Sequence, residues 1–472
     1  MKKISILIIA VFILFAFVSC NSTPENPKVE ITATVFDKEP VKLSVDADTT
    51  LESLLKNTQL KTLIGEETEY IVLVNGKVEI STYTLKNGDQ ITVLVKGEGT
   101  ETSPLLVFNA DEFKTAIENN KSIKFISDIT VPANTWFANT YTGTIDGDGH
   151  KLIIDEPPMD VKYASNSEFA LFGWVNGTIK NLEYETNGMK ALVYADEKEL
   201  IFENVTVRGE MNGADTNVGS FLLFVNDKVS FNNCTNYANI IDKVGGNHYG
   251  SAFIGGYMQP SATSIIFENC KNYGNLFFGK NAAFLIGNPH QIKKDIIKIT
   301  NCYNYGLIQA FGVVGGISWP NSSFNDTAEM NNYNKDSGKI EKIDNSIKSF
   351  TVEKDGSFKV TTNGVTNIKI DLQFNITYYL KGTTENGGNR NMTIEYSITE
   401  DNKLPVSIQI ADKDHEHESI ANGVLYIDPF AYEFKENEYD VNKFPTEITY
   451  YAIDINPKTN TFRGMASCTI SK

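Results

Sequence analysis

The sequence predicts a mainly β protein in three parts: a small α+β domain, a solenoid of stacked coils of parallel strands, and an antiparallel β-sandwich. Two observations lead to this fold class. First, one ten-residue pattern recurs as FNNCTNYANI, FENCKNYGNL and ITNCYNYGLI, beginning at Phe231, Phe267 and Ile299. Second, segments with the two-residue alternation of strands lie on both sides of these repeats. The chain of 472 residues is too long for one ordinary core, so several domains are expected.

The N-terminus has the layout of a secretory signal peptide. Two lysines precede an apolar run at 4–17, which is followed by Val-Ser and then Cys20. A signal peptide that ends in this way resembles those of bacterial lipoproteins, which implies that Cys20 is diacylated and becomes the first mature residue. Simple cleavage and an uncleaved anchor are the alternatives. We expect a signal peptide at 1–19, a polar tether at 20–28 and a membrane contact through the lipid.

Composition narrows the location and the partners. The formal charge of −17 becomes −17 − 2 = −19 when the two lysines of the signal peptide are removed. Such an acidic chain is a poor ligand for nucleic acid, so none is expected as a partner. The predicted location is the cell envelope, at the outer membrane or cell surface rather than on the periplasmic face of the inner membrane.

Residues 29–98 predict a compact ββαββ domain. Two alternating strands precede a helix that carries three leucines, with Thr49 and Glu52 spaced as a capping box. Two strands with Asn-Gly turns follow. The order, with VNGK and LKNGDQITVL in these places, resembles the ubiquitin-like β-grasp sulfur carriers of thiamine and molybdopterin biosynthesis. Their chemistry needs a free C-terminal Gly-Gly, whereas Gly97 is followed by further domains here, so we expect a spacer or binding module.

Residues 104–345 predict the solenoid, after a linker that ends at Pro104. A helix capped by Asn109, with Glu112 three residues later, precedes a strand and the string GTIDGDGHK. This order resembles the entrance to a right-handed parallel β-helix of the pectin-lyase-like superfamily. Residues 349–472 lack the repeat, and their alternating strands predict an antiparallel β-sandwich.

The repeats share an asparagine that we expect at a corner of each coil. Apolar residues two apart face one side of a strand, and the next buried position comes three residues later, so the chain must turn between them. Asparagine tolerates the left-handed backbone of such a corner. The coils should stack these residues into a column at ~4.8 Å spacing: Asn181, Asn204, Asn233, Asn269 and Asn301.

The residues that follow these asparagines form a second predicted column. It comprises Leu182, Val205, Cys234, Cys270 and Cys302. Leucine and valine share the column with cysteine, and the sequence has no CxxC pair. We therefore expect reduced cysteines in an apolar core, although a disulfide or a metal site is the alternative.

Three sets of residues are candidates for chemistry or binding. Asp146 and Asp148 are paired carboxylates, and the β-helix resemblance implies general acid work or Ca²⁺ binding for such a pair; a tight turn is the alternative. His415 and His417 would share one face of an extended segment and predict a Zn or Ca site, unless they lie at a polar hairpin tip. No other cofactor is expected.

Three tyrosines recur at one position of the repeat: Tyr237, Tyr273 and Tyr305. If they face outward, they form an aromatic ribbon, flanked by Asn236, Asn272 and Asn304, that suits sugar rings. If they face inward, they are a ladder in the core.

The predicted function is a non-enzymatic, lipid-anchored envelope protein. Its β-helix would be a stalk that presents a β domain for adhesion or glycan binding, with a polysaccharide or a host surface glycoprotein as partner. The alternatives are a polysaccharide lyase or glycoside hydrolase on the β-helix, which rests on Asp146 and Asp148, and a metal-dependent module around His415 and His417.

Overall fold

In the computed structural model the chain forms two compact units, Met1–Glu98 and Gly99–Lys472. No helix in the described part of the chain is long and apolar enough to cross a membrane. The structure describes residues 26–36, 38–65, 69–132, 135–155, 170–188, 191–212, 217–242, 249–257, 262–289, 292–318, 330–364, 367–379, 386–395, 403–410, 419–421, 424–427, 447–456 and 461–471.

The first unit contains a mixed five-stranded sheet with two short helices. The strand order is β2-β1-β5-β3-β4; β1 and β5 are parallel, and the other neighbours are antiparallel. Leu51, Leu54 and Leu60 from the helices are buried with the apolar face of the sheet. The elements are β1 (Lys28–Val35), β2 (Val41–Asp46), α2 (Leu51–Leu55), α3 (Thr58–Ile64), β3 (Tyr70–Val74), β4 (Lys77–Val78) and β5 (Gln90–Val95).

The predicted capping box on α2 was wrong by one residue. Thr50, not Thr49, is the N-cap, and its hydroxyl accepts a hydrogen bond from the backbone N–H of Ser53 at 3.3 Å. Glu52 therefore lies too early in the helix to reach back to the cap, and its carboxylate pairs with Lys56 at 2.7 Å instead. The helix α3 follows at once, capped by Asn57.

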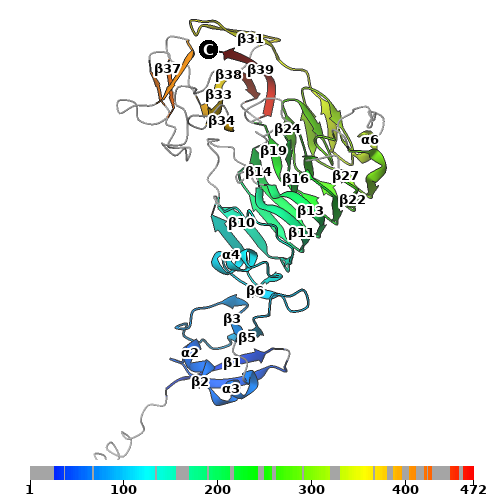
Figure 1. Ribbon diagram of the computed structural model, residues 1–472. Coiled ribbons are helices and arrows are strands. Elements are labelled where there is room, and N and C mark those ends of the chain that lie inside the picture. Colours follow the sequence, from blue (N-terminus) through cyan, green and yellow to red (C-terminus); the bar gives the residue numbers. More distant parts are fainter. Residues whose placement is uncertain are drawn as a thin grey trace, which may run out of the picture. The chain divides into compact units, whose positions relative to one another are not determined.

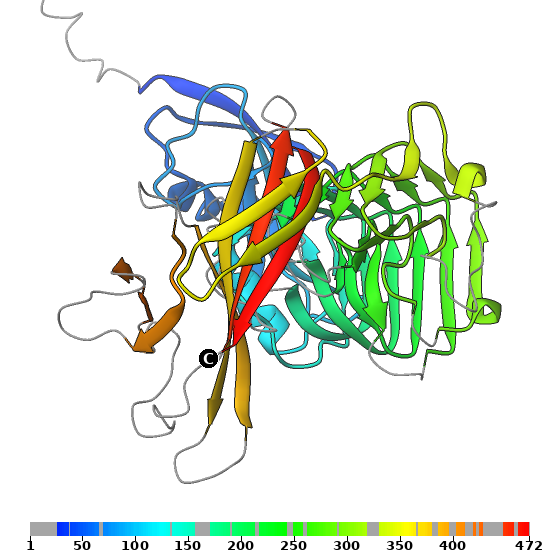
Figure 2. The ribbon, with the colours of Figure 1, turned by 90° about the horizontal axis from the view of Figure 1, so that it is seen from above.

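The second unit contains a parallel β-helix whose coils run along four faces (Figures 1 and 2). The first face holds β6 (Leu105–Val107), β7 (Ile123–Phe125), β9 (Thr144–Asp146), β11 (Ala170–Lys180), β13 (Ala191–Glu203), β17 (Lys228–Asn232), β22 (Ser264–Glu268) and β26 (Ile297–Thr300); β16 (Leu222–Val225) and β21 (Ile254–Tyr257) extend it beside β13. The second face holds β8 (Ile129–Pro132), β10 (Lys151–Asp155), β12 (Glu183–Thr186), β14 (Thr206–Asn212), β18 (Thr235–Asn236), β23 (Lys271–Asn272) and β27 (Tyr303–Asn304).

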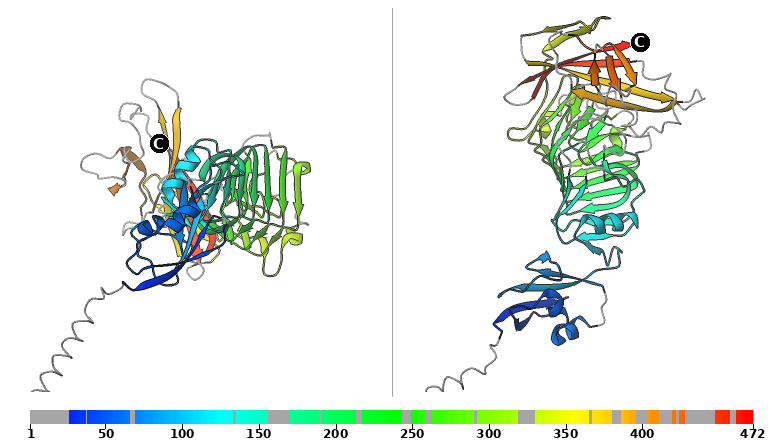
Figure 3. Two further views of the ribbon diagram at one scale, coloured as in Figure 1. Left: turned by 90° about the horizontal axis from the view of Figure 1, so that it is seen from below. Right: turned by 90° about the vertical axis from the view of Figure 1, so that its left-hand side faces the viewer.

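The remaining two faces complete each coil. The third face holds the end of β14 with β19 (Asn239–Ile241), β24 (Leu276–Phe278), β28 (Leu307–Ala310) and β30 (Lys339–Lys342), and the fourth holds β15 (Asn217–Gly219), β20 (Tyr249–Ser251), β25 (Asn281–Ala283) and β29 (Val314–Gly315). The short helices η1 (Lys294–Ile296) and α6 (Met330–Tyr333) lie between strands. The strands that pair within these faces are parallel in the described part of the chain, and Figure 3 shows them stacked in two further views.

The register of the coils places like residues above one another. Phe202, Phe231 and Phe267 occupy equivalent positions on the first face. Their buried rings stack with centroids 4.9 Å apart in each neighbouring pair. This ladder follows from the repeat, because parallel in-register strands bring identical side chains to one strand spacing.

Helix α4 (Ala110–Glu118) packs at the start of the β-helix. Asn109 caps it as predicted, since its side-chain oxygen accepts the backbone N–H of Glu112 at 2.9 Å. Phe113 is buried and contacts Phe125 and Phe137 edge to face. The helix thus covers apolar side chains that the first coil would otherwise leave open.

The C-terminal region is mostly antiparallel, apart from the parallel pair β35 and β37, and it packs against the third face of the β-helix. Its main sheet has the order β34-β33-β38-β39, and β31 and β32 form a hairpin. Tyr451, Ile453 and Met465 of this sheet bury Phe277 of β24. The strands are β31 (Ile347–Val352), β32 (Phe358–Thr362), β33 (Asn367–Tyr379), β34 (Asn386–Glu395), β35 (Ser407–Ile410), β36 (Ser419–Ala421), β37 (Val424–Ile427), β38 (Glu447–Asn456) and β39 (Thr461–Ser471).

The predicted fold class is therefore confirmed. The protein is mainly β: in sequence order it has an N-terminal sheet domain, a parallel β-helix and a C-terminal region of mainly antiparallel sheets.

Candidate functional site

The corner between the first and second faces carries the predicted asparagine column. Asn181, Asn204, Asn233, Asn269 and Asn301 have φ angles of 50°, 53°, 53°, 54° and 52°. Their amides bond along the column: Asn204 donates to Asn181 at 3.0 Å, and Asn233 donates to Asn204 at 3.2 Å. The left-handed corner predicted from the repeat is confirmed.

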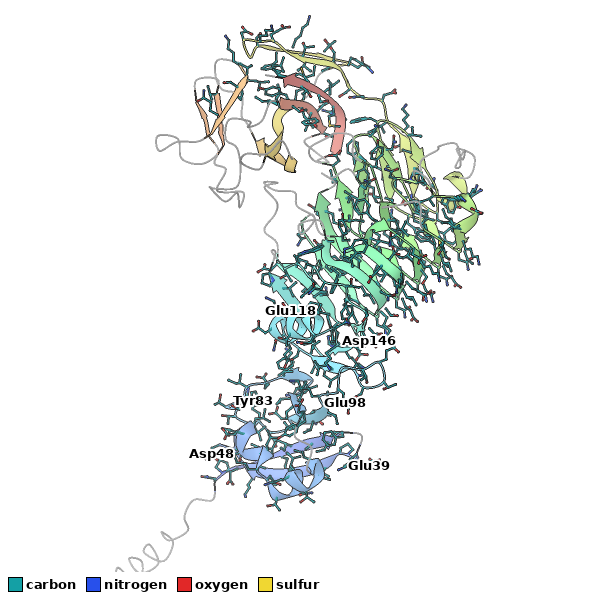
Figure 4. The ribbon with its side chains drawn as sticks, viewed as in Figure 1. Glu39, Asp48, Tyr83, Glu98, Glu118 and Asp146 are labelled. Carbon is teal, nitrogen blue, oxygen red and sulfur yellow. The ribbon has the colours of Figure 1, made fainter. Side chains whose placement is uncertain are left out.

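Asp146 lies at the end of this column next to Asn181. Its Oδ1 accepts the side-chain N–H of Asn181 at 3.0 Å and the backbone N–H of Asp148 at 3.0 Å. Its other oxygen lies 3.5 Å from Lys180. Figure 4 shows Asp146 at the edge of the coils. Asp146 thus ends the asparagine column with an acceptor.

Asp148 has different surroundings. It is half exposed, adopts a left-handed φ of 49° and pairs with Lys124 at 3.1 Å. The chain turns here because Gly149 also has a positive φ. The two aspartates are joined by a backbone hydrogen bond, and Asp148 lines a cavity.

That cavity is an open depression of about 590 Å³ at the corner column. It is lined by Asp148, Gly149, Asn181, Leu182, Glu183, Asn204 and Thr206. Glu183 is its most strongly held charge, with Lys151 at 2.7 Å and the Nε of Arg208 at 2.8 Å. Burial opposes ionisation of Glu183, but the hydrogen bonds from Lys151 and Arg208 outweigh it and lower its pKa.

The cysteine column is inside the β-helix, as predicted. Cys234, Cys270 and Cys302 are buried and free. Burial raises the pKa of the Cys270 thiol, while the hydrogen bond with Cys270, followed by burial, raises the pKa of Cys302. The raised pKa values of Cys270 and Cys302 disfavour the thiolate form that a metal needs.

The asparagines beside the tyrosines face inward, which corrects the prediction that they would flank an outward aromatic ribbon. Asn236, Asn272 and Asn304 are fully buried. The amide of Asn236 donates to Asn272 at 2.8 Å, and that of Asn272 donates to Asn304 at 2.7 Å. Because adjacent residues of a strand point to opposite faces, inward asparagines leave each following tyrosine outside.

The three tyrosines form an exposed column on the second face, which we call the tyrosine column. Tyr237 and Tyr273 are 40% and 38% exposed. The ring centroids are 4.9 Å apart between Tyr237 and Tyr273 and 4.6 Å between Tyr273 and Tyr305, and both pairs are stacked. The guanidinium of Arg208 lies 4.2 Å from the ring centroid of Tyr237 and extends the stack by one coil.

This stacking changes what the column can bind. Tyr273 has a ring on each side, so its exposed part is mainly the ring edge and the phenol. Sugar rings therefore lack the open aromatic face that the outward alternative assumed. Burial, with Tyr237 and Asp336 adding to it, raises the pKa of Tyr273, so its hydroxyl stays protonated at neutral pH and both donates and accepts hydrogen bonds.

The depression and the tyrosine column are continuous. Glu183 lines the depression and holds Arg208, which in turn stacks on Tyr237. Sequence reasoning missed Glu183 and Arg208, although Arg208 lies four residues after its corner asparagine, as Tyr237 does after its own. The same spacing from the corner asparagine was present in the sequence, but Arg208 stands where the later coils have tyrosine, so the position was not recognised as part of the repeat.

Two predicted sites lie outside the described residues. They are the lipidation site at Cys20 and the pair His415 and His417. In the part of the chain that the structure describes, no group of three or more His, Cys, Asp or Glu side chains is placed to hold a metal ion.

The site and fold define a β-helical protein with a polar depression and an exposed aromatic column. No protein-family model matches the chain, and no curated protein matches it. Among solved structures, the crystal structure of a candidate immunoglobulin A1 protease from Bacteroides ovatus matches with a TM-score of 0.31 and 14% identity, over 49% of this chain and 83% of that chain. Similarity at this level defines no shared activity.

Proposed function

We propose that the protein is a lipid-anchored protein of the cell envelope that binds an extended polysaccharide along the tyrosine column without cleaving it. The observation that carries the proposal is the column itself, in which three tyrosines stack on successive coils and two of them, Tyr237 and Tyr273, are exposed. Outward aromatic side chains on a rigid sheet favour binding over a role in the core.

The spacing of the column suits a polymer. Successive phenols repeat with the coils at ~4.8 Å, which is close to the length of one sugar residue in an extended polysaccharide. Tyr237 and Tyr273 each present a hydroxyl that donates and accepts. Because parallel strands fix the backbone below them, little side-chain freedom is lost on binding.

A location in the cell envelope, as proposed, would suit such a role. A lipid on Cys20 would tether the chain to a membrane, and the N-terminal domain, which resembles β-grasp proteins, would serve as a spacer or second binding module. Protease shaving of intact cells tests exposure at the surface, where a polysaccharide or a host surface glycoprotein is within reach. Full protection from protease would argue against adhesion.

Catalysis is the alternative, and one observation favours it: Asp148 and Glu183 are carboxylates that line the same depression. A general acid must hold a proton near neutral pH. The hydrogen bonds from Lys151 and Arg208 lower the pKa of Glu183, which works against that role. Release of new reducing or unsaturated ends from polysaccharide, above a heat-treated control, would support catalysis and contradict our proposal.

Affinity electrophoresis with soluble polysaccharides tests binding directly. We expect Tyr273→Ser to weaken retardation about 3- to 10-fold, since it removes one phenol and two stacking contacts. Tyr249→Ser is the matched control, because Tyr249 is a partly exposed tyrosine on the fourth face with Lys280 over its ring. Equal retardation of the wild-type protein and both variants would contradict the proposal.

A further inference from the structure

We propose that the depression beside the tyrosine column is a subsite for an uncharged, hydroxyl-rich sugar residue, so that the ligand is a neutral polysaccharide. This inference rests on the proposed function and adds the ligand's charge class.

The charges at the depression balance one another. Two carboxylates line it, and a third, Glu185, shares Lys151 with Glu183; each of the three carboxylates has a cation within 4 Å. The pairs are Asp148 with Lys124 at 3.1 Å, Glu183 with Lys151 at 2.7 Å and with Arg208 at 2.8 Å, and Glu185 with Lys151 at 3.4 Å.

This balance disfavours a charged ligand. An anionic sugar would meet Asp148 and Glu183 at the wall of the cavity, and a cationic sugar would compete with the cations that already hold them. A neutral hydroxyl avoids both costs, because it donates to the remaining lone pairs of a carboxylate without disturbing the ion pair. The hydroxyl of Thr206 and the amide of Asn204 add neutral polar groups to the wall.

The register shows how such a ligand continues beyond the depression. Glu183 pairs with Thr206 and Thr206 with Thr235 across the second face. Thr235 lies two residues before Tyr237 on the same outward side. A chain seated in the depression would therefore run past two threonines, with the tyrosine column beside it.

The exposed cation farther along this row is Lys271, which lies two residues before Tyr273. It is the residue that an anionic polysaccharide would use, so it provides the contrasting variant. Lys271→Ala should leave binding of a neutral polysaccharide within about 2-fold of wild type, because Lys271 has no ion pair to lose among the described residues.

The experiment compares neutral polysaccharides with their own carboxymethylated derivatives, so that each pair shares one backbone. We expect the neutral member to bind at least ~10-fold more tightly, with its Kd changing less than about 2-fold between low and high salt. In the Asp148→Asn variant the local charge becomes positive, so the affinity for the carboxymethylated member should rise relative to the affinity for the neutral one. Asparagine keeps the left-handed backbone at this position.

The outcomes separate the two proposals. Tighter, salt-sensitive binding of the carboxymethylated members that Lys271→Ala abolishes would overturn the neutral subsite and leave polysaccharide binding intact. Preferential binding of a chitosan control, whose amino groups are cationic, would overturn it too. If no member of any pair binds the wild-type protein, the proposed function itself fails.

Discussion

Asn233 illustrates how a single residue fixes the corner of a coil. It combines a left-handed φ of 53° with an amide that donates to Asn204 in the coil below. Glycine would keep the backbone and lose the amide, whereas alanine would lose the amide and strain the backbone. The two requirements can therefore be tested separately.

We expect Asn233→Ala to have a lower free energy of unfolding than Asn233→Gly, by about 1 kcal/mol, since a Cβ disfavours this backbone. Both variants should be less stable than wild type because the ladder hydrogen bond is lost. Urea unfolding measures the order of stability of the wild type and the two variants. Ser230 of β17 is the control, where the extended strand should make glycine the less stable substitution. Equal stability of the two Asn233 variants would contradict the left-handed backbone at this corner.

The corner asparagines and the apolar column could be predicted because each follows from a residue type with one strong local preference. The direction of the tyrosines could not be predicted, since Asn236 and Tyr237 are adjacent and either could have faced inward. The buried amide ladder decides between them, because it hydrogen-bonds Asn236 to Asn272 in the next coil and to the backbone carbonyl of Ala238. Such pairing between coils depends on register, which a single repeat does not fix.

Among the elements of the coil, the cysteine column is the simplest to test. Leu182 and Val205 occupy the same column as Cys234, Cys270 and Cys302, so the position selects apolar volume rather than sulfur. The combined replacement of all three cysteines by valine should therefore keep the fold.

We expect this triple valine variant to stay within about 2 kcal/mol of wild type in unfolding free energy, because apolar side chains of similar size replace one another at modest cost. Cys270→Asp should be far less stable, since it buries a carboxylate among apolar groups. Loss of folding in the triple variant, together with bound metal in the wild type, would favour the metal alternative.

Short helices show where sequence reasoning failed at the scale of elements. The predicted single helix is two, α2 and α3, and its cap moved from Thr49 to Thr50. Both threonines are acceptable caps, and helices of five and seven residues offer too little periodicity to choose between them. The longer α4 was correctly predicted because Asn109 and Glu112 bracket a clear amphipathic pattern.

At the scale of the whole molecule, the C-terminal sheet is packed on the β-helix rather than only following it in sequence. Tyr451 is buried at this contact with Phe277. Removal of the region after Ser349 would therefore expose apolar side chains of the third face. Point variants in the C-terminal sheet are therefore better than truncation for testing whether the β-helix presents this region for adhesion.

Tyr451 makes this contact dependent on pH. Burial, together with the charge of Asp242, raises the pKa of Tyr451 to about 12. A raised folded pKa gives stability that is complete below the ordinary value of about 10 and is lost as the pH rises toward 12. Between about pH 9 and pH 11, the wild type should lose about 1 kcal/mol more than Tyr451→Phe in urea unfolding. Equal losses of unfolding free energy in the wild type and in Tyr451→Phe would show that the phenol is not buried.

The central claim is that the tyrosine column is the binding surface. Hydroxyl-radical footprinting of the full chain, with and without a neutral polysaccharide that it binds, tests this most directly. We expect the ligand to protect Tyr237, Tyr273 and Tyr305 from oxidation and to leave Tyr249 unchanged. Protection of Tyr249 or of the C-terminal strands, with the column still fully oxidised, would contradict it.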